Sequence, residues 1–238
     1  MKRYILPLCF LLLFVFTSGA FAQLSVGVAG GWAKNYLYTN VGYRVFTHYA
    51  PATGFSVSVP IRYSVNGWLA VQAEPQFIQK NYQLRRTGYY DGIYSATTNQ
   101  YLQLPLIGHV SFGGPRVKGF LNLGGYAGYW AAGANEGVTP NIDHASEADT
   151  YAGVLEEMPA QHFNEPYAFD SRKDRRLELG WLAGTGLSYQ TVRCHFFVEG
   201  RYYQASSDQQ KNYMLNQIPR YNQTFLVQIG CLYRLNLN

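Results

Sequence analysis

The sequence predicts an all-β fold, an eight-stranded antiparallel up-and-down transmembrane β-barrel. Two observations predict it: long stretches in which apolar residues alternate with polar or small ones, and connections between them that are alternately long and short. Alternation places successive side chains on opposite faces of a sheet, so one face can meet lipid while the other lines a lumen. Charged residues make up 14% of the chain, well below the roughly 25% of soluble proteins.

The stretch 99–112 shows the alternation most clearly. Its length exceeds the roughly 5–6 residues of a strand in a soluble domain, and a single apolar residue, Ile107, interrupts its polar face. The apolar face carries Leu102, Leu104, Leu106, Val110 and Phe112. Because proline cannot donate to the hydrogen-bond ladder of a sheet, Pro105 predicts a local bulge or kink.

Seven further stretches complete the predicted wall. The eight expected strands are 24–32, 55–63, 68–80, 99–112, 117–130, 176–189, 192–204 and 222–235. The long connections are 33–54, 81–98, 131–175 and 205–221, and the short turns are 64–67, 113–116 and 190–191. Outer-membrane barrels have long extracellular loops and short periplasmic turns. We therefore expect the long connections at the cell surface and both termini in the periplasm.

The first 22 residues have the pattern of a secretory signal peptide. Lys2 and Arg3 precede an apolar run over residues 5–16, and Ala20-Phe21-Ala22 forms a small-x-small cleavage site. Cleavage between Ala22 and Gln23 is therefore expected, and residues 23–238 form the predicted barrel domain. No later window holds the roughly 18 consecutive apolar residues of a transmembrane helix.

Net charge and cysteine content narrow the possible partners. The formal net charge is +5, and loss of Lys2 and Arg3 leaves about +3, which is too weak to indicate nucleic acid. Cys194 and Cys231 fall on the outward face of two adjacent predicted strands. We expect them to be neighbouring free thiols facing lipid, with a cross-strand disulfide as the open alternative.

Five stretches together resemble the PorT-like outer-membrane β-barrel family of Gram-negative bacteria. They are YLQLPLIGHVSFG (101–113), WLAVQAEPQFIQKNY (68–82), LNLGGYAGY (121–129), LGWLAGTGLSY (179–189) and FFVEGRYYQ (196–204). Their order and spacing carry the resemblance, and Gln103 stands where the family often has Glu. The resemblance implies an eight-stranded barrel, and one branch of the family is tied to protein secretion across the outer membrane.

The alternation predicts a polar network inside the barrel. Its members are Glu74, Gln103, Glu199, Arg201 and Gln228, which all point inward near mid-height. An eight-stranded barrel has a bore that side chains can fill, and buried charges must be paired. We expect Arg201 to bind at least one glutamate and to plug the lumen, with a gated proton or ion path as the alternative.

Two sets of residues are candidates for a catalytic or a metal site. His109 and Ser111 resemble the His-x-Ser pair of lipid A deacylase barrels, but they lie near the short turn 113–116, at the end of the barrel away from lipid A. The connection 131–175 holds acidic and histidine residues whose spacing matches no known ligand pattern, namely Asp143, His144, Glu147, Asp149, Glu156, Glu157 and His162. The sequence thus predicts no catalytic residue, no metal and no cofactor. It also predicts a short helix over 146–158.

These observations favour a non-enzymatic integral outer-membrane barrel that presents extracellular loops for binding, adhesion or secretion assistance. A narrow porin-like channel for small solutes is the alternative, and a lipid-modifying enzyme is the third hypothesis. Expected partners are outer-membrane lipid, the barrel-assembly machinery, and secretion components or an extracellular ligand. Lipopolysaccharide is an expected contact of the basic rim formed by Arg172, Lys173, Arg175 and Arg176, with ordinary solvation of these side chains as the alternative.

Overall fold

The computed structural model describes residues 23–40, 46–88, 91–140 and 160–235. Residues 1–22 lie outside this part, and so do most of the acidic connection and the helix expected over 146–158. The strands are β1 (Gln23–Tyr38), β2 (Thr47–Ser58), β3 (Ile61–Ser64), β4 (Leu69–Ala73), β5 (Gln76–Gln79), β6 (Tyr82–Arg86), β7 (Tyr94–Gly113), β8 (Val117–Pro140), β9 (Ala160–Pro166), β10 (Leu177–Gln190), β11 (Cys194–Ala205) and β12 (Tyr221–Leu235). The described residues include no helix long and apolar enough to cross a membrane.

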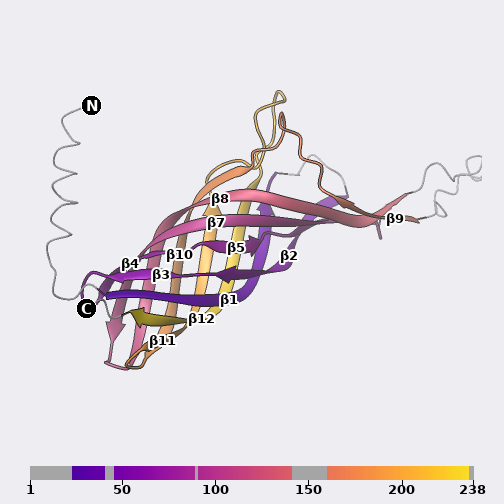
Figure 1. Ribbon diagram of the computed structural model, residues 1–238. Coiled ribbons are helices and arrows are strands. Elements are labelled where there is room, and N and C mark those ends of the chain that lie inside the picture. Colours follow the sequence, from indigo (N-terminus) through magenta and orange to yellow (C-terminus); the bar gives the residue numbers. More distant parts are fainter. Residues whose placement is uncertain (1–22, 41–45, 89–90, 141–159, 236–238) are drawn as a thin grey trace, which may run out of the picture.

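The strands form one antiparallel sheet that closes on itself (Figure 1). β1 pairs with β12 from Leu24 opposite Leu235 to Tyr38 opposite Tyr221, which joins the first strand to the last. Some of the twelve strands are segments of one interrupted strand of the ring. β2 and β3 are two such segments, and both pair with β1. β4, β5 and β6 are three segments of the next strand, and all three pair with β7. The ring thus has eight positions, and the predicted eight-stranded up-and-down barrel is confirmed.

Two of the predicted strands are interrupted at prolines. The expected strand 55–63 breaks at Pro60, between β2 and β3, and the expected strand 68–80 breaks at Pro75, between β4 and β5. Proline has no backbone N–H to donate to the ladder. Neighbouring hydrogen bonds still cross both gaps: Gly27 donates to the Pro60 carbonyl oxygen, and Val59 donates to that of Pro75. The wall therefore remains continuous.

The prediction of a bulge or kink at Pro105 was wrong. β7 runs unbroken through Pro105, which lies opposite Tyr126, and the register shift falls between Gln100 and Tyr101. The Pro105 carbonyl oxygen accepts a hydrogen bond from Glu74, so this edge of Pro105 faces the interruption between β4 and β5. The missing N–H of Pro105 therefore lies where the neighbouring strand is itself irregular, and no kink is required.

Several strands extend farther than the alternation predicted. β1 continues to Tyr38, and β8 continues to Pro140, where β9 pairs with its outer end. These segments occupy parts of the expected connections 33–54 and 131–175. Figure 1 shows β7 and β8 leaving the ring together, with β9 beside their far end. In the outer part of β1 the inward side chains remain buried as far as Leu37, so the strand continues to pair after the apolar pattern predicted from the sequence has ended.

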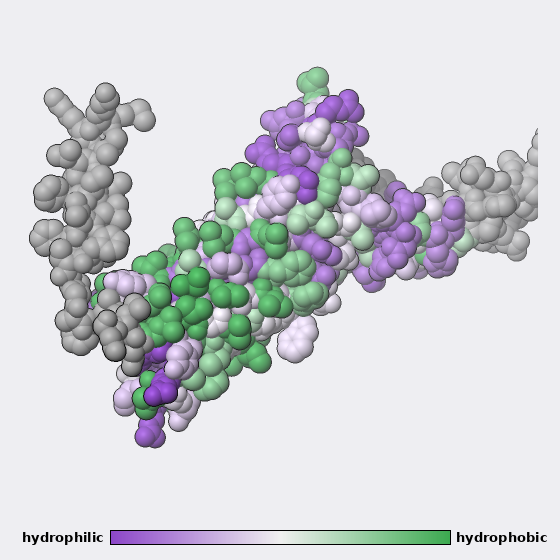
Figure 2. All heavy atoms as spheres, viewed as in Figure 1, coloured by the Kyte–Doolittle hydropathy of each residue, from purple (hydrophilic) through white to green (hydrophobic). Residues whose placement is uncertain are grey.

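An apolar band surrounds the outside of the ring. On β7 the burial alternates from Tyr101 to Val110, with Leu102, Leu104 and Leu106 exposed outward. From Leu102 to Phe112 the strand rises roughly 34 Å, and a tilt of about 40° reduces this to about 26 Å, the height of an outer-membrane apolar band. Figure 2 shows hydrophobic residues along the flank and hydrophilic residues on the projections.

Exposed aromatic side chains lie near both ends of this band, as in the girdles of membrane barrels. Beside the short turns they are Tyr63, Trp68, Phe112, Tyr189 and Tyr233, and toward the other end they are Trp32, Phe55, Tyr129, Trp181 and Phe225.

Candidate functional site

The candidate site is the polar interior of the ring. Glu74 lies in the break between β4 and β5, Gln103 on β7, Glu199 and Arg201 on β11, and Gln228 on β12. All five predicted side chains are buried, and none is more than 4% exposed. Their direction follows from the alternation of each strand, because Phe196 and Val198 on β11 face outward while Glu199 and Arg201 face inward.

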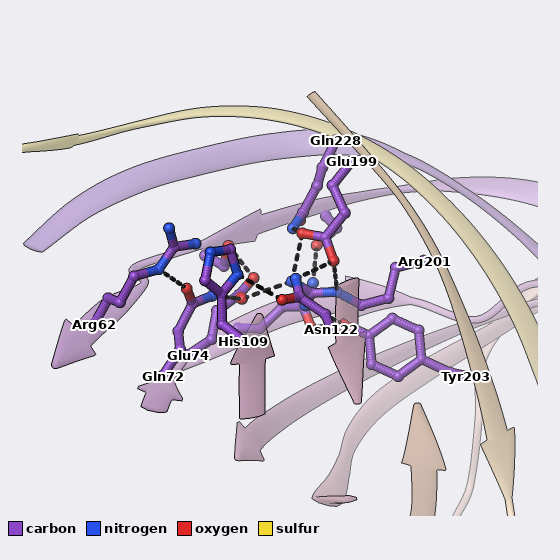
Figure 3. Close-up of polar contacts among 12 residues, drawn as sticks. Arg62, Gln72, Glu74, His109, Asn122, Glu199, Arg201, Tyr203 and Gln228 are labelled. Carbon is purple, nitrogen blue, oxygen red and sulfur yellow. Dashed lines mark hydrogen bonds and ion pairs between the residues drawn. The ribbon is translucent and has the colours of Figure 1, made fainter. Parts of the chain in front are cut away.

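Arg201 is the centre of the network (Figure 3). Its Nη2 lies 3.0 Å from Glu74 Oε2 and 2.8 Å from Glu199 Oε2, and its Nε lies 2.8 Å from Glu199 Oε1. Its Nη1 donates to the Tyr203 hydroxyl at 2.8 Å. One fully buried guanidinium thus joins two carboxylates from opposite parts of the wall. Hydrogen bonds between ionised groups such as these are stronger than those between neutral groups.

Amide and hydroxyl groups satisfy the remaining carboxylate oxygen positions. Glu199 accepts from Asn122 Nδ2 at 2.7 Å and from Gln228 Nε2 at 3.0 Å. Glu74 accepts from Ser58 Oγ at 2.8 Å and from Gln72 Nε2 at 2.7 Å. These bonds offset part of the cost of removing the charges from water.

Gln103 reaches the charges only through intermediates. Its Nε2 donates to Gln76 Oε1 at 2.6 Å, and Gln76 Oε1 also accepts from the Tyr203 hydroxyl at 2.9 Å. Tyr203 in turn accepts from Arg201. Gln103 therefore extends the network and contacts neither glutamate.

A second buried ion pair was not included in the predicted network. Lys80 Nζ lies 2.5 Å from Glu178 Oε1, and Glu178 also accepts from the Tyr126 hydroxyl and from Asn222 Nδ2. The lysine ammonium lies 5.0 Å from the ring centroid of Tyr101 and 4.7 Å from that of Tyr126. Lys80 directly follows β5 and Glu178 lies on β10, and both occupy inward positions of the predicted alternation, so the sequence contained the signal that could have found them.

Aromatic side chains pack above the second pair. Trp130 stacks on Tyr101 with ring centroids 6.1 Å apart, and Tyr167 and Phe169, from the connection before β10, pack on Trp130 at 4.8 and 4.9 Å. Arg176 lies over the Phe169 ring at 4.2 Å. Interior residues thus form polar and aromatic layers one above the other.

The His-x-Ser pair has separate partners. His109 Nδ1 lies 2.7 Å from Asn122 Oδ1, whereas Ser111 Oγ donates to the Trp68 carbonyl oxygen at 3.5 Å. Of the candidate metal ligands, only His162 lies within the residues that the structure describes, and its side chain is exposed on β9. The described part of the chain contains no group of three or more His, Cys, Asp or Glu residues that could hold a metal.

The basic rim is partly neutralised by Asp170. Arg172 Nε and Lys173 Nζ each lie 3.6 Å from an Asp170 carboxylate oxygen. The backbone hydrogen bond from Arg172 and the positive charges of Arg172 and Lys173 hold the pKa of Asp170 below its usual value. Arg176 donates to the carbonyl oxygens of Trp130 and Ala131, beside the end of the pairing between β8 and β10.

The two cysteines lie diagonally across β11 and β12. Cys194 is opposite Tyr233, and Cys231 is opposite Phe196, so the thiols are offset by two residues. Both are free thiols and half-buried on the outward side.

Comparison with known proteins gives a family match over most of the chain. Residues 21–209 match the outer membrane protein beta-barrel domain family. No curated protein matches the sequence.

Several solved structures are similar in fold. OprG from Pseudomonas aeruginosa is 13% identical, with a TM-score of 0.48 and coverage of 90% of this chain and 97% of that one. Neisserial surface protein A from Neisseria is 12% identical, with a TM-score of 0.47 and coverage of 89% and 97%. Ail of Yersinia pestis is 13% identical, with a TM-score of 0.39 and coverage of 90% and 99%.

Proposed function

Because the chain belongs to the outer membrane protein β-barrel domain family, we propose that it is a non-enzymatic barrel with a plugged lumen. In this proposal it presents its long connections at the cell surface to an extracellular ligand or a secretion component. The family match and the closed apolar ring establish an integral outer-membrane protein. The remaining parts of the proposal rest on the interior and on the projections.

The single observation that carries the plug is the fully buried position of Arg201 between Glu74 and Glu199. These side chains reach across the lumen from β4–β5 and β11, so a solute would have to displace an ion-paired guanidinium. The Lys80–Glu178 pair and the Trp130 aromatic cluster lie in further layers. Three layers that must all open favour a binding or assembly protein over a pore.

The projections support a binding role. β7, β8 and β9 continue past the apolar band, and the connection between β11 and β12 rises above the ring as a second projection (Figures 1 and 2). The latter carries Leu215, which is 97% exposed, and Met214, which is 58% exposed. These two adjacent apolar side chains are accessible to a partner on an otherwise polar projection.

Orientation and targeting are parts of the same proposal. The short turns would face the periplasm, together with both termini, and a signal peptide over residues 1–22 would direct export. Barrel-assembly machinery would insert the chain, and lipopolysaccharide would contact the basic rim. Membership of the PorT-like branch, with a role in secretion, is the narrower assignment that the strand motifs support.

Planar-bilayer recording tests the plug. Purified protein is first inserted into lipid vesicles, and protection of the barrel from added protease verifies the insertion. These vesicles are then fused with the planar bilayer. We expect no steady conductance, because a solute would have to displace the ion-paired side chains of Glu74, Glu199 and Arg201. A steady ohmic conductance that scales with the amount of inserted protein would contradict the plug and favour the porin-like channel.

A further inference from the structure

The short-turn end of the lumen contains a cavity of about 160 Å³. Three cationic side chains line it, from β3, β8 and β12: Arg62, Lys118 and Arg234. His109 and His195 also line it, and its described lining includes no aspartate or glutamate. None of the plug residues Glu74, Glu199 and Arg201 lines this cavity, and the proposed function makes no use of it.

Arg62 is the most constrained of the three cations. It is only 6% exposed, and its Nε donates to Gln72 Oε1 at 2.8 Å. Among the described residues neither of its terminal nitrogens has a hydrogen-bond partner. Figure 3 shows a single dashed line from Arg62, toward Gln72. Arg62 lines the cavity, and its terminal nitrogens are not among the buried side-chain atoms that lack a partner. These donors are therefore accessible from the cavity, where an acceptor can bind them.

The other two cations lie nearer the mouth of the cavity. Arg234 Nη2 lies 2.8 Å from His195 Nε2, and Lys118 Nζ makes a long contact of 3.4 Å with the Gly67 carbonyl oxygen. Since Arg234 can only donate, His195 accepts through Nε2, and its Nδ1 carries the proton. The half-buried Lys118 has no carboxylate partner among the described residues.

Charge balance leaves the cavity positive. The charges of Arg62 and Arg201 balance those of Glu74 and Glu199, and both glutamates are hydrogen-bonded to Arg201. Lys118 and Arg234 therefore remain in excess at the cavity. Positive side chains in a cleft with low-dielectric walls concentrate anions from solution.

We infer that this cavity is a binding site for a phosphate group. Its volume exceeds several water molecules of about 30 Å³ each and is below the roughly 300 Å³ of a pocket for a drug-sized ligand. Arginine presents a planar fork of donors that matches phosphate oxygens, and lysine adds a point charge. The phosphate comes either from free inorganic phosphate or from a lipid head group at the membrane surface.

Phosphate binding is measured by equilibrium dialysis of radiolabelled inorganic phosphate against the full chain folded in maltoside micelles, which contain no phosphate. We expect one saturable site per barrel, weakened at least tenfold by Arg62→Gln and by Lys118→Gln. Arg85→Gln, at an exposed arginine on β6, is the matched control and should change affinity less than twofold. Heat-modifiable gel migration verifies folding, and Lys118→Gln, at a half-buried position, keeps the test informative if Arg62→Gln fails to fold.

A second arm identifies the source of the phosphate. Phosphatidylglycerol is added to the same micelles, and its retention on purified wild-type and variant protein is measured. Saturable phosphate binding assigns a free anion. Lipid retention without phosphate binding, lost in Lys118→Gln and kept in Arg85→Gln, assigns a head group and also supports the site. Absence of both in the wild type, or equal binding in wild type and Lys118→Gln, would overturn the inference.

Discussion

At the residue scale, the interior depends on a few fully buried charges. Arg201 binds both Glu74 and Glu199, whereas Lys80 binds Glu178. Pairing does not make such charges strongly stabilising, because desolvation offsets the attraction. Removing one partner is expensive, however, since the other charge is left buried and unpaired. Single and paired substitutions should therefore behave very differently.

Replacing Arg201 with Ala should leave two carboxylates without their cation. We expect the free energy of unfolding to fall by about 3–5 kcal/mol, measured by urea titration with heat-modifiable gel migration as the readout. Arg85→Ala is the control, because Arg85 is exposed and bonds only Gln83 within the described structure, and it should cost less than about 1 kcal/mol. Equal transitions in the two variants would contradict the buried pairing.

The Lys80–Glu178 pair should show strong coupling. Lys80→Met alone should destabilise the barrel by about 3–5 kcal/mol, because Glu178 remains charged and buried. Lys80→Met combined with Glu178→Gln should cost less than the sum of the two single changes, since no charge is left unpaired. A double-mutant cycle by the same unfolding assay measures this difference. Additive costs would show that the two side chains do not act as a pair.

Gly184 provides the space for the Glu199 carboxylate. A Cβ at Gly184 would lie 2.5 Å from Glu199 Oε1, whereas a Cβ at Gly200 would have no heavy atom nearer than 3.8 Å. Gly184→Ala should lower the free energy of unfolding by about 1–3 kcal/mol, because Glu199 must move from Arg201. Gly200→Ala should be neutral or slightly stabilising. Comparable losses in both variants would argue against this steric role.

At the element scale, the apolar alternation determines which strands can be predicted. The alternation predicts the eight strands of the ring, because each membrane-spanning segment has one face toward lipid. The outer parts of β1 and β8 and all of β9 lack that constraint, so their pairing is not visible in the sequence. The breaks at Pro60 and Pro75 follow from the missing N–H, yet Pro105 tolerates an unbroken strand because of its neighbour. Such compensation depends on pairing partners that periodicity alone does not identify.

The same limit applies to the interior. Alternation gives the inward direction of Glu74, Glu199 and Arg201, and also that of Lys80 and Glu178. It does not give the height at which side chains from different strands meet, because that depends on the tilt and register of the ring. The sequence therefore predicts that Arg201 pairs with at least one of the two glutamates but does not show which one, and it does not identify the Lys80–Glu178 pair.

Closure between β1 and β12 can be tested by a disulfide. Val28 lies opposite Cys231 across this seam. In a Cys194→Ser background, Val28→Cys should form a bond with Cys231 under mild oxidation, since opposite Cβ atoms in a sheet are about 4.5–5.5 Å apart. Leu24→Cys, which lies opposite Leu235, is the control and should remain free. Loss of free thiols on mass analysis reports the bond, and a free Val28→Cys thiol would contradict the register.

At the scale of the whole molecule, the protein combines a closed apolar ring, an ion-paired interior and projections from one end. The ring removes sheet edges that hydrocarbon could not satisfy. The filled interior gives the outer projections a fixed base. A binding protein needs these projections in the medium, so its orientation in the membrane is the claim on which the proposed function depends.

Cysteine labelling of intact cells tests that claim most directly. In a background with Cys194→Ser and Cys231→Ser, one variant carries Leu215→Cys in the connection between β11 and β12, and the other carries Asn66→Cys in the short turn between β3 and β4. With a membrane-impermeant maleimide, Leu215→Cys should react in intact cells, whereas Asn66→Cys should react only after the outer membrane is permeabilised. Labelling of Asn66→Cys in intact cells, with Leu215→Cys protected, would contradict the account.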